Sequence, residues 1–280
     1  VDLDEGLPLD PGAVARHIGS KTAAVLPVHM RGAPSALHDL LGVCSEAGIP
    51  LVEDACQAAG VTYRGRPVGS FGRVSAFSTQ YAKLVSTGEG GVVVTDDDDA
   101  LVAALDAHDP ANAIRRGQPP SAYPGLNLRC TELQAAIGRV QLRRLGTLVE
   151  RTRAHAARIR QVVEAASDFT LRTAHDPDGA NGIAVVFLAP TPERAREVRD
   201  VLVTDGLPAL VLHEPGVIDL HVSSSWRPVE VALADQGMGA PDCSRSLELL
   251  ARAIQVDVHP LFEPQDVDDV CRSLERALSV

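Results

Sequence analysis

The sequence predicts an α/β protein with a mostly parallel sheet in its first half and a smaller α+β region in its second half. Up to about residue 150, short apolar runs alternate with stretches whose apolar residues recur at helical spacing. From about residue 168 the order of these patterns changes. We therefore predict two domains, residues 1–150 and 151–280, with the second beginning in a connecting helix.

The first predicted elements include a βαβ unit, which follows a helix over residues 11–18. The apolar runs Ala23–Val28 and Ile49–Glu53 are typical of short buried strands. Between these runs, apolar residues at helical spacing predict a helix over 37–47, which ends at Gly48. Strand, helix and strand within about 30 residues indicate a right-handed crossover and a parallel sheet.

Further short strands are predicted at Val61–Tyr63, Val74–Ser78 and Gly91–Thr95. The acidic run that follows, Asp96–Asp99, has two interpretations, a cation site or the N-terminal end of a helix. Ligands on consecutive residues cannot all face one ion, whereas the helix dipole stabilises negative charge at a helix N-terminus. The helix start is therefore the favoured interpretation.

The segment Thr131–Gln134 has the pattern of a capping box and predicts the start of a long helix. We expect that helix to run into the arginine-rich stretch 151–160 and to join the two domains. The smaller domain is expected to contain strands at Gly182–Leu188 and Ile254–His259, a candidate strand at Leu220–Val222, and helices at Pro192–Asp205 and Glu263–Leu278.

Composition narrows the function classes. The net charge is −11 and there is no run of lysine and arginine, which is not the pattern of a nucleic-acid-binding protein. No apolar stretch has the roughly 20 residues that a membrane span needs. The N-terminus is acidic, unlike a signal peptide, and the five cysteines are dispersed without a CxxC pair. These features predict a cytoplasmic protein without a metal site, a membrane span or a nucleic-acid partner.

One segment with side chains suited to catalysis is Leu51–Gln57. Asp54 lies just past the C-terminal end of a predicted parallel strand, where α/β sheets commonly bind ligands. Gln57 follows three residues later. The alternative for Asp54 is that it caps the next short helix.

A second such segment, Ala76–Gly91, leads from a strand through a loop to a glycine-rich turn. Ser78, at the end of the strand, can donate a hydrogen bond to a phosphate. Lys83, in the loop, is one of only two lysines; the other is Lys21. A lysine that burial and nearby positive charge keep partly neutral can form an imine with a cofactor. The alternative is an ordinary solvated lysine, which is how Lys21 is interpreted.

Six motifs follow one another in order along almost the whole chain. They are PVHxxG at 27–32, EDAxQAxG at 53–60, GxxxGSxG at 65–72, FSxxxxKxxxTGEGG at 77–91, GxNxRxxExQAA at 125–136, and HP…DVD at 259–268. Together they resemble the DegT/DnrJ/EryC1/StrS family, the sugar aminotransferases of fold type I that use pyridoxal 5'-phosphate (PLP). The resemblance implies the large domain of that fold, with a mostly parallel sheet, and a smaller α+β C-terminal domain.

The resemblance also implies a role for five residues. Lys83 would form the Schiff base with PLP, and Asp54 would keep the pyridine nitrogen protonated. Gln57 would contact the ring or its 3'-oxygen, and Ser78 would bind the phosphate. Asn127 would reach the phosphate of the neighbouring subunit's cofactor, which implies a homodimer with shared active sites. The alternative for Asn127 is a loop residue that satisfies backbone groups.

The reaction implied is transfer of an amino group from glutamate or glutamine to a keto-sugar or keto-cyclitol, in antibiotic or polysaccharide biosynthesis. One alternative is a PLP-dependent sugar dehydratase, but such relatives replace the lysine with histidine, and Lys83 is present. Another is a non-catalytic partner of a complete subunit. That family has a further N-terminal segment, with a turn that grips the phosphate and an aromatic residue over the ring, and the sequence does not show it.

Overall fold

The computed structural model describes residues 1–119, 125–219, 221–222, 225–237, 239 and 242–279. The chain forms two compact units that exchange segments along the sequence. The first, which we call the sheet unit, contains residues 8–153 and 174–183. The second, the C-terminal unit, contains residues 1–7, 154–173 and 184–280. Helix α5 (Glu132–Glu164) contributes to both, so the predicted long helix does run through the arginine-rich stretch.

The sheet unit contains, besides the first part of α5, short strands and helices in alternation. In chain order they are α1 (Pro11–His17), the 3-10 helix η1 (Met30–Gly32), α2 (Leu37–Ala47), β1 (Val52–Asp54), β2 (Thr62–Tyr63), β3 (Arg66–Pro67), β4 (Val74–Ser78), β5 (Gly91–Val94), α3 (Asp98–His108), α4 (Asn112–Arg115) and the 3-10 helix η2 (Pro177–Gly179).

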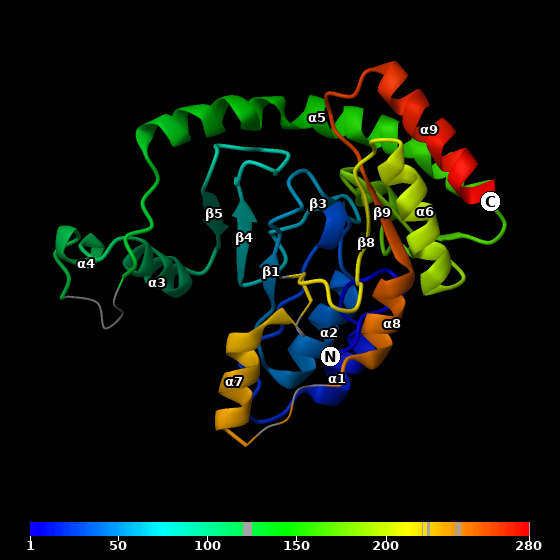
Figure 1. Cartoon of the computed structure of the whole chain (residues 1–280). Helices are drawn as coiled ribbons and strands as arrows, with labels where there is room; N and C mark the ends of the chain where they lie inside the picture. The colour runs from blue at the N-terminus through cyan, green and yellow to red at the C-terminus, as the bar shows by residue number, and fades with distance from the viewer. Residues whose placement is uncertain (120–124, 220, 223–224, 238, 240–241, 280) are drawn as a thin grey trace. The chain divides into compact units, whose positions relative to one another are not determined.

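Strands β1, β4 and β5 lie side by side in that order (Figure 1). The pair β1–β4 is parallel and the pair β4–β5 is antiparallel, so the sheet of the described residues is mixed. The predicted strand at 23–28 lies parallel to β1 but makes only two isolated bridges, at Val25 and Val28. Pro27 lies between them and has no N–H to donate, which interrupts the ladder.

Helix α2 packs its apolar face into the core of this unit. Leu37, Leu40 and Cys44 are buried at the spacing that the sequence predicts. Gly48 ends the helix in the left-handed region, at φ 66°, and its N–H donates to the carbonyl of Cys44. Both the helix and its stop signal are confirmed.

Two helix starts follow the predicted capping chemistry. Asp97 caps α3 by accepting a hydrogen bond from the N–H of Ala100 at 2.7 Å, so the helix interpretation of the acidic run is confirmed. Thr131 Oγ1 accepts from the N–H of Gln134 at 3.2 Å, and Gln134 Oε1 accepts from the N–H of Thr131 at 2.8 Å. This reciprocal pair is the capping box expected before α5.

The C-terminal unit is built on an antiparallel sheet with the strand order β6–β7–β9–β8. Its elements are β6 (Thr170–Leu171), β7 (Ala184–Leu188), α6 (Pro192–Thr204), β8 (Ala209–Val211), α7 (Arg227–Asp235), α8 (Ser244–Arg252), β9 (Ala253–Asp257) and α9 (Pro264–Ser279). The end of α5 and helices α6 and α9 cover one face of this sheet, and α8 covers the other.

Most of the predicted elements of this region are present, with shifted ends. The strand predicted at Gly182–Leu188 begins at Ala184, and the one predicted at Ile254–His259 ends at Asp257. The candidate strand at 220–222 includes Leu220, which lies outside the described residues; His221 and Val222 form a turn and bend. In the described part of the chain, no helix combines the length and the apolar character needed to cross a membrane.

Candidate active site

Asp54 and Ser78 lie at the C-terminal ends of neighbouring parallel strands. Asp54 is the last residue of β1 and pairs in register with Ala76 of β4. Ser78 ends β4 two residues later, and side chains two residues apart in a strand share a face of the sheet. Asp54 and Ser78 therefore lie on the same face, at the edge where α/β sheets bind ligands.

Asp54 also shapes the backbone that follows it. Its Oδ1 accepts a hydrogen bond from the N–H of Cys56 at 2.9 Å, which is a turn of the kind that aspartate commonly makes. No helix begins there, so the cap of a helix, the alternative for Asp54, is wrong. The local turn explains why a carboxylate stands at this strand end, and it holds the side chain in a fixed orientation.

The charges of Asp54 and Lys83 both affect the thiol of Cys56. Burial, the hydrogen bond with Asp54 and the charge of Asp54 raise the pKa of the Cys56 thiol to about 11, and the charge of Lys83 works in the opposite direction. The thiol therefore lies within the field of both a carboxylate and an ammonium group. Asp54 and Lys83 thus act on the same thiol in opposite directions, and their joint role in one site stays a prediction.

The loop that carries Lys83 is closed at its base. Thr79 Oγ1 and Thr87 Oγ1 lie 2.8 Å apart, and the N–H of Thr87 donates to the carbonyl of Thr79 at 2.9 Å. Within the loop, the N–H of Lys83 donates to the carbonyl of Gln80 at 2.9 Å. These bonds fix the loop in which Lys83 is half-buried, and the role of its ammonium group stays a prediction.

The side chain of Gln57 is bonded to the backbone of Arg31, a residue with an uncommon backbone conformation. Its Oε1 accepts a hydrogen bond from the N–H of Arg31 at 2.7 Å. Arg31 has φ 56°, in the left-handed region that residues with a Cβ rarely adopt. The amide oxygen of Gln57 is therefore engaged, and its NH2 is the end that can donate to a ligand.

Glu53, which the sequence did not single out as a functional residue, is a fully buried anion beneath the site. Burial alone would raise its pKa, but hydrogen bonds from His29 and from the N–H groups of Gly69 and Gly72 lower it to about 2. The carboxylate oxygens of Glu53 accept from His29 Nε2 at 3.0 Å, Gly69 N at 2.8 Å, Phe71 N at 2.8 Å, Gly72 N at 2.6 Å and Ser75 Oγ at 3.1 Å.

His29, also fully buried, links Glu53 to the first strand segment. Its Nδ1 accepts from the N–H of Ser35 at 3.1 Å, so its proton lies on Nε2, which donates to Glu53. The N–H of His29 donates to the carbonyl of Asp54 at 3.0 Å. The PVHxxG, EDAxQAxG and GxxxGSxG motifs thus meet in one buried network, which fixes the strand end that carries Asp54.

Asn127 has different neighbours. It lies in a segment whose N–H groups at Leu126 and Leu128 donate to the carbonyls of Ala107 and His108 at the end of α3. Asn127 has φ 54°, and its Oδ1 accepts from Arg129 Nε at 2.8 Å. Leu126 and Leu128 on either side are 73% and 64% exposed, so this segment presents apolar side chains at the surface of the chain.

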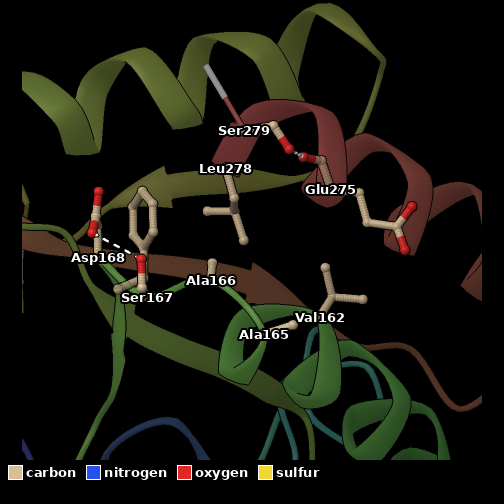
Figure 2. A pocket seen from close by; sticks show the side chains of 9 residues that line it. Val162, Ala165, Ala166, Ser167, Asp168, Glu275, Leu278 and Ser279 are labelled. Atoms are coloured by element: carbon tan, nitrogen blue, oxygen red, sulfur yellow. Dashed lines mark hydrogen bonds between the residues drawn. The ribbon is translucent and has the colours of Figure 1, made fainter.

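A separate hollow lies in the C-terminal unit (Figure 2). It has a volume of about 310 Å³ and is lined by the end of α5, the residues before β6 and the last turns of α9. Its polar groups include Asp168, which accepts from Ser167 Oγ at 3.0 Å, and Glu275. All five predicted site residues belong to the sheet unit, so this hollow is not the predicted site.

The family model for the DegT/DnrJ/EryC1/StrS aminotransferases matches residues 1–275. This chain belongs to that family. The predicted family, fold class and enzyme class are thereby confirmed. PLP as the cofactor of the family is confirmed too, and a solved structure of the same fold, E. coli GDP-4-keto-6-deoxy-D-mannose-3-dehydratase, contains bound PLP.

Three relatives illustrate the range of this aminotransferase family. The chain is 28% identical to the spore coat polysaccharide biosynthesis protein SpsC of Bacillus subtilis, over 98% of this chain and 71% of SpsC. It is 38% identical to L-glutamine:2-deoxy-scyllo-inosose aminotransferase of Micromonospora echinospora, over 56% of this chain and 40% of the relative. The structure of S. venezuelae DesV in complex with a ketimine intermediate matches all of this chain and 72% of DesV, with 27% identity and a TM-score of 0.82. The chain thus spans 40% to 72% of the length of these relatives.

The side chains around Asp54 fit the cofactor of the family. PLP has a ring nitrogen that is paired with an acid, an aldehyde that reacts with an amine, and a phosphate that accepts hydrogen bonds. The strand ends provide an acid at Asp54, an amine at Lys83, and a hydroxyl donor at Ser78, while Gln57 provides an amide donor. The role of each single residue remains a prediction.

Proposed function

We propose that this chain is an aminotransferase that moves an amino group from glutamate or glutamine to a keto-sugar or keto-cyclitol, with PLP bound at Lys83. The observation that carries the proposal is the position of Asp54 and Ser78 on one face at the strand ends, with Lys83 half-buried in the closed loop that follows β4. An acid and a half-buried amine at the edge where such sheets bind ligands are what PLP chemistry requires.

In this proposal four residues of the chain each have a separate role toward PLP. Lys83 binds PLP through its amine, and when that amine is freed it accepts a proton from the substrate carbon and returns it. Asp54 keeps the ring nitrogen protonated. Gln57 donates to the ring oxygen, and Ser78 donates to the phosphate. When bound, PLP supplies the electron sink for the amino transfer.

We further propose that Asn127 serves the site of a second copy of the chain, in a homodimer. Backbone hydrogen bonds hold its segment against the end of α3, and the segment exposes Leu126 and Leu128 beside the asparagine. Exposed apolar side chains next to a polar one are typical of contact surfaces between subunits. The side chain of Asn127 is held in one orientation by the hydrogen bond that its Oδ1 accepts from Arg129 Nε at 2.8 Å.

The relatives support the substrate class. The relative from Micromonospora echinospora is named for L-glutamine as donor and for a cyclitol ketone as acceptor. SpsC is named for polysaccharide biosynthesis. We infer a place in antibiotic or polysaccharide biosynthesis, in the cytoplasm. The presence of Lys83 disfavours a sugar dehydratase. The product formed from a keto-sugar distinguishes the two reactions, because an aminotransferase yields an amine and a dehydratase yields a deoxy-ketone.

The test uses the two lysines of the chain as a matched pair. With PLP added, the unaltered chain and the Lys21→Ala variant should show a visible absorption band that borohydride reduction fixes to the protein. Lys83→Ala should show no such band, and peptide mass mapping should find the label on Lys83. If the band is absent from the unaltered chain, or remains in Lys83→Ala, the proposal fails, and a non-catalytic partner becomes the better description.

A further inference from the structure

Asn181, far in sequence from the predicted site, lies directly behind it. The segment 174–183 returns to the sheet unit after the chain has entered the C-terminal unit. Asn181 in this segment is fully buried. Its Nδ2 donates to the backbone carbonyls of Gln57 at 3.2 Å and Ala59 at 3.1 Å, so both of its amide hydrogens are used to hold the backbone around Gln57.

The other side of Asn181 holds the segment that binds the Gln57 side chain. The N–H of Asn181 donates to the carbonyl of Gly32 at 2.9 Å. Gly32 has φ 69°, and a Cβ on it would lie 1.9 Å from Asn181 Oδ1, so the two residues approach as closely as glycine allows. The next residue toward the N-terminus, Arg31, gives its N–H to Gln57 Oε1.

These bonds form a closed ring. It runs from the Gln57 carbonyl to the Asn181 amide, through the Asn181 backbone to Gly32, and from Arg31 back to the Gln57 side chain. One buried residue therefore holds the backbone of Gln57 directly and its side chain through Arg31.

Asn181 itself is anchored to a long element. Its carbonyl accepts from Thr152 Oγ1 of α5 at 2.6 Å, and Thr152 is also fully buried. Its Oδ1 accepts from the N–H of Ile183 at 3.3 Å. The polar groups of Asn181 are thus bonded on all sides, and a buried network that is fully satisfied has one preferred geometry.

We propose that Asn181 is a positioning residue for Gln57, and that it sets which end of the Gln57 amide faces the cofactor. Because Arg31 occupies Oε1, Gln57 presents its NH2 and can donate to the anionic 3'-oxygen of the PLP ring. That donor stabilises the oxygen anion, so its loss raises the pH at which the visible PLP band titrates and weakens PLP binding. This inference rests on the proposed function.

The test compares Asn181→Asp with Cys44→Ala. The aspartate keeps the shape of the side chain but removes the NH2 that binds Gln57 and Ala59. Cys44 is buried in the apolar core of the same unit, on α2, and that core contains neither Asn181 nor Gln57. The Cys44→Ala variant therefore shows the effect of a loss of stability alone. We expect Asn181→Asp to raise the dissociation constant of PLP about tenfold, as for the loss of one hydrogen bond to a charged group. We expect the midpoint of the band's pH titration to rise. Cys44→Ala should lower only the melting temperature.

A double-mutant comparison separates positioning of Gln57 from a general structural role. In a Gln57→Ala background, Asn181→Asp should cause no further change in the titration midpoint, because the residue it positions is gone. Asn181→Ser, which introduces no charge, repeats the measurement if the aspartate variant does not fold. The inference is overturned if the unaltered chain shows the band but neither Asn181→Asp nor Asn181→Ser shifts its titration midpoint. It is also overturned if Asn181→Asp causes an equal shift in the Gln57→Ala background. Absence of that band would overturn the proposed function instead, and this inference with it.

Discussion

At the scale of single residues, neighbouring positions in β1 have opposite environments. Consecutive side chains of a strand point to opposite faces, so Glu53 faces the buried network and Asp54 faces the candidate site. Replacement of the two carboxylates should therefore change different properties of the protein. The charge of Glu53 contributes to the stability of the chain, whereas the charge of Asp54 is proposed to act on the cofactor.

Glu53 gives a pH dependence with a definite sign. Its pKa falls from the usual 4.5 to about 2 in the folded chain, a difference worth about 3 kcal/mol. A pKa that is lowered on folding contributes stability that is fully present above the unfolded value and is lost as the pH falls toward the folded value. We expect the free energy of unfolding to drop between about pH 5 and pH 2.

The variant that checks this is Glu53→Gln, measured by urea denaturation. It should lower the free energy of unfolding by about 3 kcal/mol at pH 7, because the amide places its NH2 against donors that the carboxylate satisfies. The deficit should shrink as the pH falls toward 2. Asp54→Asn serves as the control and should change stability by less than about 1 kcal/mol. A constant deficit at all pH values would contradict the assigned role of the charge.

The reactivity of the Cys56 thiol measures the effect of the Asp54 and Lys83 charges, and no cofactor is needed for the measurement. Alkylation needs the thiolate, so a thiol whose pKa is about 11 should react slowly at pH 8, with a rate that still rises about tenfold per pH unit at pH 9. Asp54→Asn removes a carboxylate that raises this pKa and should speed the reaction. Lys83→Ala removes a charge that lowers it and should slow the reaction. Mass spectrometry of the Cys56 peptide measures both rates, and equal rates in the two variants would mean that the two charges do not act on this thiol.

At the scale of elements, the sequence predicts well whatever is encoded locally. The cap of α3, the capping box of α5 and the stop of α2 at Gly48 each depend on side chains within four residues of the feature. The strand at 23–28 was less predictable, because its ladder depends on one proline and on the register with β1. The small strand β8 has only three residues and too few positions to show a period.

Helix α5 gives a stability prediction of its own. Gly146 lies inside the helix with open space around its Cβ position, so Gly146→Ala should raise the free energy of unfolding by about 0.5 to 1 kcal/mol. Thr131→Ala removes half of the capping box and should lower it by about 1 kcal/mol. Thermal unfolding followed by circular dichroism measures both. A loss of stability in Gly146→Ala would show that this part of α5 has contacts beyond those of the described residues.

At the scale of the whole molecule, the candidate site combines local motifs with distant segments. Asp54 and Lys83, which are 29 positions apart, belong to two motifs of one unit. Asn181 belongs to a segment that returns from the other part of the chain, and its sequence surroundings show no motif. Nothing in the spacing of residues indicates such a return, since it depends on how the chain packs. For that reason the predicted site contained the reactive groups but not the residue behind Gln57.

The proposed dimer makes the last prediction, which needs two inactive chains. If Asn127 serves the neighbouring subunit, a Lys83→Ala chain still offers its Asn127, and an Asn127→Ala chain still offers its Lys83. Mixed dimers of the two then contain one intact site out of two. Since half of the dimers formed at random from equal amounts are mixed, about a quarter of the normal sites should be restored.

The measurement refolds or co-expresses equal amounts of the two variants and determines the PLP bound at a concentration that saturates only intact sites. Each variant alone should bind little, and the mixture should bind about a quarter of the normal amount. If Asn127 instead serves its own chain, or only satisfies its loop, the mixture will bind no more than the average of the two variants. In that case the exposed Leu126 and Leu128 must be explained by another contact. The result depends only on which chain supplies the asparagine, so it tests the shared site without knowledge of the sugar.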